Sequence, residues 1–132
     1  MPYSISWAED QTLVHQVYID EISRQDFEAM VCNSRRMLIS VPHAADIIIE
    51  WQGRRHVMND LSMFYGAIFA EKYVPPNQRF VFLVNMPAAS RVIMQAMQRA
   101  APRSAGSLYF VETVEQVHKL RTYLLDEKVK SV

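Results

Sequence analysis

The chain has 132 residues, half of them hydrophobic and 21% charged, which suits one globular domain that folds around its own core. Its 14 basic and 14 acidic residues cancel, so the net charge gives no general attraction to nucleic acid or to an anionic membrane surface. No apolar run is long enough to cross a bilayer, and the first residues lack the basic and apolar pattern of a secretory signal. A single cysteine, Cys32, excludes an internal disulfide and favours a cytoplasmic location.

The first third of the chain predicts a hairpin followed by a helix. Residues 4–7 are expected to form a short edge strand, and residues 13–19 a second strand antiparallel to it, because the polar turn between them is short. Ser23 is expected to cap a helix, and Asp26 stands at the position that completes a capping box. The inner face of this helix is expected to carry Phe27, Met30, Val31, Ser34 and Leu38.

The middle of the chain contains two further strands and the helix between them. Ala45–Trp51 includes consecutive isoleucines, and such a short apolar run predicts a strand that is buried on both faces. A helix capped by Asn59 or Asp60 is expected to follow and to end near Tyr73, ahead of a pair of prolines. Residues 79–85 are again apolar at most positions and predict the next buried strand.

The last third repeats the alternation of helix and strand. Pro87 is tolerated in the first turn of a helix, and Pro102 is expected to end that helix and to precede a turn. Residues 107–111 predict the last strand, and Thr113 and Gln116 have the spacing of a capping box at the start of the last helix. The order β-β-α-β-α-β-α-β-α indicates a single α/β domain with a mostly parallel central sheet and about four helices.

This order of elements resembles the STAS family, which has the SpoIIAA-like fold of the anti-sigma factor antagonists. Two local stretches are also similar: Ala45–Trp51 with the capped helix that follows it closely, and residues 109–116, where a strand runs straight into the last helix. The resemblance covers the whole chain, residues 1–132. It implies a SpoIIAA-like, non-catalytic interaction domain whose partner is a protein, such as an anti-sigma-factor-like kinase.

In the antagonists of the STAS family, the loop before the second helix carries an Asp-Ser-Ser/Thr-Gly-like motif. Phosphorylation of its hydroxyl residue adds a charge that breaks the partner complex. The corresponding stretch of this chain has Asp60 and Ser62, whereas the consecutive serine and the glycine are missing. The resemblance therefore implies partner docking through this loop and the second helix, and it does not extend to phosphorylation of Ser62.

Residues that follow the carboxyl ends of the strands are candidates for partner docking. In a parallel sheet these ends lie along one edge, where ligands and partners usually bind. Methionine side chains adapt to varied surfaces, so methionines near this edge could form a soft apolar patch or could fill gaps in the core. The candidate partner-binding residues are Met58, Asn59, Asp60, Ser62, Met63 and Met86.

An alternative function is a small-molecule sensor that binds an anion or a nucleotide in the loop 52–60. Arg54, Arg55 and His56 precede a helix N-terminus, where arginines beside free N–H groups can bind phosphate or carboxylate. The opposing interpretation is a solvated charged loop, because Asp60 would occupy the same positive helix end and no glycine-rich phosphate cradle is present.

The remaining reactive side chains show no catalytic or metal-binding pattern. The histidines have no paired helical spacing, so a dedicated metal site is not expected, and Cys32 is expected to be a small buried side chain within a helix. No cluster of acid, base and nucleophile can be assembled, so neither an enzyme nor a cofactor is expected. A homodimer that forms through the edge strand with Tyr3 and Trp7 is a further alternative.

Overall fold

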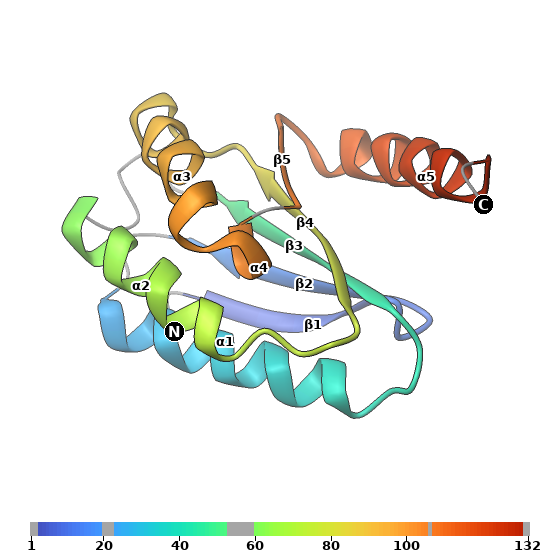
Figure 1. Cartoon of the computed structure of the whole chain (residues 1–132), viewed down its shortest axis with the longest axis horizontal. Coiled ribbons are helices and arrows are strands. Elements are labelled where there is room, and N and C mark those ends of the chain that lie inside the picture. The colour runs from blue at the N-terminus through green and yellow to red at the C-terminus, as the bar shows by residue number, and fades with distance from the viewer. Residues whose placement is uncertain (1–2, 20–22, 53–59, 106, 131–132) are drawn as a thin grey trace.

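The computed structural model describes residues 3–19, 23–52, 60–105 and 107–130 (Figure 1). The strands are β1 (Tyr3–Glu9), β2 (Leu13–Tyr18), β3 (Ala45–Trp51), β4 (Gln78–Val84) and β5 (Leu108–Val111). The helices are α1 (Arg24–Ile39), α2 (Asp60–Lys72), α3 (Ala88–Ala100), α4 (Pro102–Ala105) and α5 (Val114–Lys130). The predicted α/β class is confirmed, and apart from the short α4 the elements follow the predicted order.

The strands lie in the sheet in the same order as in the chain, β1-β2-β3-β4-β5. β1 is antiparallel to β2, as predicted, and Tyr3 lies opposite Tyr18. β2, β3, β4 and β5 run parallel to one another, with Leu13 opposite Asp46 in the β2–β3 pair. The sheet is therefore mixed, with a parallel majority, and β1 and β5 form its edges.

A tight turn between β1 and β2 produces the antiparallel pair. Asp10 and Gln11 have left-handed φ angles of 32° and 58°, and the Thr12 N–H donates to the Glu9 carbonyl at 2.6 Å. Residues with left-handed φ angles reverse the chain direction within a few positions. A turn this short leaves no room for a crossover helix, so the two strands are antiparallel.

One face of the sheet packs against α1, α2 and α3. Alternate residues of β3, namely Ala45, Ile47 and Trp51, share a buried cluster with Met30 and Leu38 of α1. This alternation follows from the strand geometry, in which successive side chains point to opposite faces. The buried side chains of α1 belong to the predicted inner stripe, so that prediction is confirmed.

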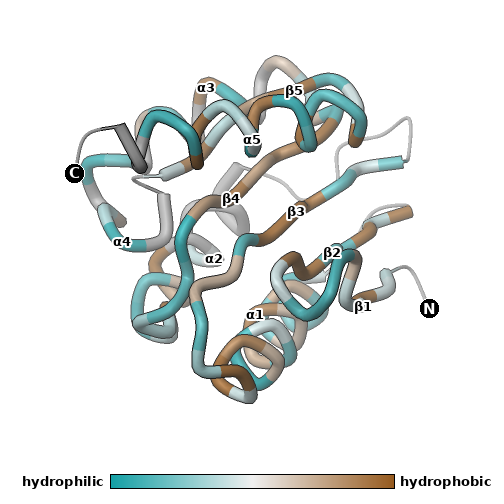
Figure 2. The backbone as a smooth tube through the Cα atoms, turned by 90° about the vertical axis from the view of Figure 1, so that its right-hand side faces the viewer, coloured by the Kyte–Doolittle hydropathy of each residue, from teal (hydrophilic) through white to brown (hydrophobic). Residues whose placement is uncertain are grey.

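The opposite face packs against α5. Ile48 of β3 and Phe82 of β4 are fully buried there beside Val117 of α5. The rest of the predicted inner stripe of this helix packs against the same cluster, namely Val114, Leu120 and Leu124. The prediction that β3 is buried on both faces is confirmed, and Figure 2 shows the hydrophobic middle of this strand.

Side-chain caps set the starts of α1 and α5. The Ser23 hydroxyl accepts from the Asp26 N–H at 3.1 Å, and the Asp26 carboxylate accepts from the Ser23 N–H at 3.1 Å, which confirms the capping box. At α5 the Thr113 hydroxyl accepts from the Gln116 N–H at 3.2 Å. The Gln116 side chain accepts from the N–H of Glu112 at 2.7 Å, so the return bond lies one residue earlier than in a standard box.

Two local predictions were wrong. The turn expected after Pro102 is the short helix α4, because a proline is well tolerated at the first position of a helix. Cys32, expected to be buried, is exposed. It lies on the side of α1 away from the buried Met30 and Ser34, since two residues along a helix correspond to more than half a turn.

Candidate functional site

The carboxyl ends of β2, β3, β4 and β5 lie along one side of the sheet, here called the carboxyl edge, because these strands are parallel. Asn85, directly after β4, has a left-handed φ of 60°, which asparagine tolerates better than most residues. Its N–H donates to the Val111 carbonyl at 3.0 Å, and its Nδ2 donates to the Trp51 carbonyl at 2.9 Å. One residue therefore connects the ends of β3, β4 and β5 and fixes the shape of this edge.

A second connection at the carboxyl edge uses Arg91 of α3. Its Nε donates to the Met86 carbonyl at 3.0 Å, and a terminal nitrogen donates to the Glu112 carboxylate at 2.7 Å. These bonds hold the start of α3 beside the segment that leads into α5. Arg91 thus positions the helix, and its charge is balanced within the protein.

Exposed apolar side chains lie next to the carboxyl edge. Tyr65 of α2 is 44% exposed and Val92 of α3 is 65% exposed, and the two helices pack against each other. The guanidinium of Arg24, the first residue of α1, lies 5.0 Å from the centre of the Tyr65 ring. Ile19, just past β2, is 45% exposed. Exposed apolar side chains beside a rigid edge suit contact with a protein surface.

The residues predicted from the sequence for the two alternative sites fall largely in and before α2. The first turn of α2 contains Asp60, Ser62 and Met63. The positions that lie outside the described residues are Met58 and Asn59 of the predicted docking site, and Arg54, Arg55 and His56 of the predicted anion site. Anion binding by the loop 52–60 stays a prediction of the sequence.

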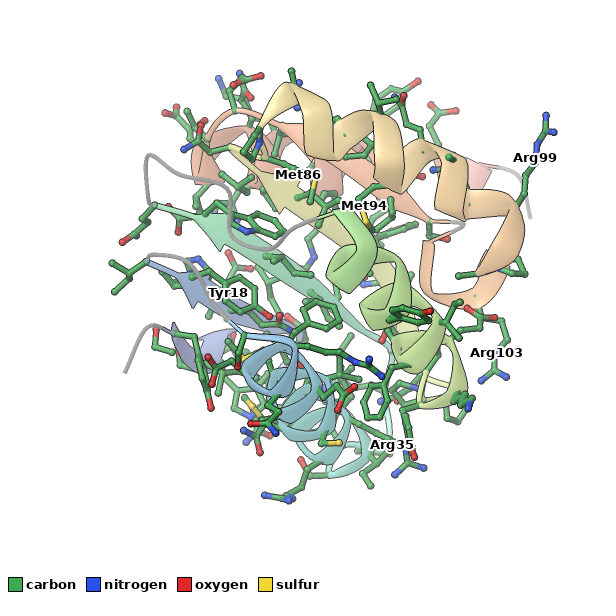
Figure 3. All side chains as sticks on the ribbon, turned by 90° about the vertical axis from the view of Figure 1, so that its left-hand side faces the viewer. Tyr18, Arg35, Met86, Met94, Arg99 and Arg103 are labelled. Atoms are coloured by element: carbon green, nitrogen blue, oxygen red, sulfur yellow. The ribbon has the colours of Figure 1, made fainter. Side chains whose placement is uncertain are left out.

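Met86, also a candidate for docking, is only 3% exposed and belongs to the core. It lines a cavity of about 100 Å³ between the sheet and α1, α2 and α3. Ile49 and Leu83 of the sheet form part of one wall, and Ala70 of α2 and Met94 of α3 form part of the other. Figure 3 shows Met86 and Met94 on the α3 side of this layer. The structure thus favours the core interpretation of Met86 over the surface one.

Two buried polar side chains in the wall of this cavity, Gln16 and Ser34, bond to each other, and Gln16 also bonds to the buried Tyr18. The Gln16 side-chain amide of β2 donates to the Ser34 hydroxyl of α1, and the Tyr18 hydroxyl donates to the Gln16 Oε1 at 3.2 Å. Burial raises the pKa of Tyr18, so its hydroxyl stays protonated and remains a donor. Mutual bonding satisfies these groups, as burial requires.

A buried carboxylate near the amino end of β3 is a feature that sequence reasoning missed. Asp46 is fully buried, and Arg79 of β4 donates to it from two nitrogens, each at 2.9 Å. Arg121 of α5 donates to it at 2.6 Å, and the Phe80 N–H donates at 2.9 Å. Burial alone would raise the pKa of Asp46, but the bonds from Arg79, Arg121 and Phe80 hold it below its usual range. The available signal was an aspartate at the second position of an otherwise apolar run.

The same charge network extends to the hairpin turn. Arg121 also donates to the Glu9 carboxylate and to the Thr12 carbonyl, each at 3.2 Å. His118 of α5 lies 3.0 Å from the Glu9 carboxylate through its Nδ1. The network connects β1, β3, β4 and α5 at the side of the sheet opposite the carboxyl edge. Its charges are paired with one another, which is the arrangement of a structural connection.

The described residues were also compared with the requirements of a metal site and of a membrane span. Within residues 3–19, 23–52, 60–105 and 107–130, no group of three or more His, Cys, Asp or Glu side chains could hold a metal ion. No helix in those same ranges has the length and apolar character needed to cross a membrane.

Comparison of the chain with protein-family models, curated proteins and solved structures found no match.

Proposed function

We propose that this chain is a non-catalytic regulatory domain that docks a protein partner at the carboxyl edge, through α2, the loop before it and the adjacent start of α3. The observation that carries the proposal is the pair of exposed apolar side chains on adjacent helices there, Tyr65 and Val92. The sequential strand order and the helices on both faces are compatible with the resemblance to the STAS family. That resemblance implies a cytoplasmic regulatory protein, such as a kinase, as the partner.

The energetics of such a contact predict which substitution will disrupt it. Burying one large apolar side chain contributes about 1.5–3 kcal/mol, and tyrosine is among the residues that dominate protein interfaces. A carboxylate in the same place would lose its hydration on docking without a partner charge, which opposes binding. Val92→Glu should therefore lower the affinity for the partner at least about tenfold, equivalent to about 1.4 kcal/mol.

The matched control is Tyr123→Glu on α5. Tyr123 is 59% exposed, close to the 65% of Val92, but it belongs to the helix on the other face of the sheet. Both variants should keep the melting temperature of the wild type, because substitutions at such exposed positions change stability by only about 0.5 kcal/mol. A difference in partner affinity between the two variants then results from the substituted surface and not from unfolding of the protein.

The experiment compares affinity capture by the wild type, Val92→Glu and Tyr123→Glu, and then measures binding of the identified protein with purified components. A regulatory protein that binds the wild type and Tyr123→Glu, but binds Val92→Glu at least tenfold more weakly, is the expected result. Equal binding to all three variants would remove the carboxyl edge as the docking surface.

Self-association is a distinct outcome of the same set of variants. Light scattering after size exclusion gives the mass of each variant in solution. If the wild type is a dimer and Val92→Glu alone is a monomer, a second copy of the chain covers this surface and the proposal of a different protein partner fails. A dimer that persists in Val92→Glu would instead direct attention to the edge strand β1, where Tyr3 and Trp7 lie.

A further inference from the structure

The cavity between the sheet and α1, α2 and α3 follows the direction of β3. Ile47, Ile49 and Trp51 all line it, and at about 3.3 Å per residue these positions span roughly 13 Å. A volume of about 100 Å³ spread along such a wall describes a narrow space. Trp51 lies at the carboxyl edge. Arg35 of α1 and Tyr73, directly after α2, line the cavity from positions that are exposed to solvent.

The chemistry of the wall favours an apolar occupant. Most of the side chains that line the cavity are hydrocarbon, and the buried Gln16 and Ser34 already bond to each other. A buried water normally needs two to four polar partners, whereas apolar cavities stay dry and bind small apolar molecules. A cavity of about 150 Å³ accommodates benzene, so a space of about 100 Å³ selects a slim body over a branched or polycyclic one.

Arg35 adds a charged group to this apolar space. Its side chain forms no hydrogen bond or ion pair within the part of the chain that the structure describes, although it lines the cavity. A guanidinium has five N–H donors in a planar arrangement that matches a carboxylate. In Figure 3 Arg35 lies on the α1 side of the layer, away from Met86 and Met94, so the charge and the methionines lie on different sides of the cavity.

We propose that this cavity binds a short straight-chain carboxylate of about the size of butanoate or pentanoate, with the chain between the sheet and α2 and the carboxylate at Arg35. The two parts of the ligand correspond to the two parts of the site, because hydrocarbon lines the space and a cation lies at its exposed end. This site is separate from the docking surface of Tyr65 and Val92, and its test does not require a protein partner.

The charged end of the site is tested by calorimetric titration and thermal shift with butanoate, pentanoate and the corresponding alcohols. The variants are Arg35→Gln and its neighbour Arg36→Gln, which removes the same charge from an exposed position outside the cavity wall. Both acids should bind the wild type and Arg36→Gln and raise their melting temperatures. In Arg35→Gln the affinity for the acids should fall about tenfold, the value of a hydrogen bond to a charged group, while that for the alcohols stays the same.

The apolar part of the site is tested by filling it. Ala70→Leu adds volume to a helix residue of the cavity wall and should abolish binding of the acids and the alcohols alike, and Ala70→Val serves if the larger substitution does not fold. The proposal is overturned if neither acid binds the wild type up to its solubility limit, or if the Ala70 variants bind both acids as the wild type does. Equal affinities in Arg35→Gln and Arg36→Gln would overturn the carboxylate contact.

Discussion

The two helical layers on the sheet are held in different ways. α5 is attached by the buried Asp46, which receives Arg121 from the helix and Arg79 from the sheet. α1, α2 and α3 pack mainly through apolar side chains and leave a cavity of about 100 Å³. At about 24 cal/mol per Å³, a void of that size costs on the order of 2 kcal/mol. The α5 layer is therefore fixed by directional bonds, whereas the layer of α1, α2 and α3 keeps an open space beside the sheet.

Removing the buried carboxylate should have the largest effect on this comparison. Asp46→Ala leaves Arg79 and Arg121 beside an apolar strand without their main acceptor, and breaking a buried ion pair in this way costs about 3–5 kcal/mol. Denaturant unfolding measures the loss of free energy of unfolding. The control is Glu112→Ala, which removes the more exposed pair with Arg91 and should cost less than about 1 kcal/mol. Similar costs for the two variants would show that the buried network does not fix the α5 layer.

Lowering the pH should also reduce the stability that Asp46 gives to the attachment of α5, by less than the Asp46→Ala substitution does. The pKa of Asp46 is lower in the folded protein than in the unfolded chain, where an aspartate has a pKa of about 3.9. Its contribution to stability is therefore complete above that value, and it is lost as the pH falls through the lower pKa of the folded state. Between about pH 5 and pH 2 the free energy of unfolding of the wild type should fall more steeply than that of Asp46→Asn. Parallel pH curves would contradict this assignment.

Filling the cavity should have the smallest effect and the opposite sign. Ala70→Leu adds three carbon atoms beside empty space, and imperfect packing offsets part of their transfer free energy, so a gain of about 1 kcal/mol is expected. The control is Ala96→Leu at an exposed position of α3, which should change the free energy of unfolding by less than about 0.5 kcal/mol. A loss of stability in Ala70→Leu alone would mean that the two walls lie too close for added volume.

Local signals made much of the fold predictable. The apolar run of β3 and the hydrogen-bonding pair Ser23 and Asp26 act over a few residues, so their effects could be read directly from the sequence. The face of Cys32 was missed because α1 has an inner stripe of limited width, and adjacent residues on a helix differ by about 100°. A burial assignment from one neighbour is therefore weaker than one from the whole stripe.

The candidate sites depend on contacts between distant residues, which the sequence does not display. Asp46 meets Arg79 and Arg121 at separations of 33 and 75 residues, and neither arginine stands in a local motif. Met86 could be placed near the carboxyl edge from its position after β4, but whether it faces solvent depends on where α3 packs. The cavity likewise results from several elements that do not close completely, so no single segment predicts it.

The separation of 75 residues between Asp46 and Arg121 also has a consequence for the order in which the protein is completed during translation. A nascent chain that ends before Arg79 carries Asp46 without either arginine, and a somewhat longer one can pair it with Arg79 alone. The second arginine arrives only with α5, which also brings Val117 onto the exposed hydrocarbon of Ile48 and Phe82. Until then the emerging chain has a sheet with one uncovered apolar face and a carboxylate that lacks one of its two arginine partners, the state in which it most needs protection from aggregation.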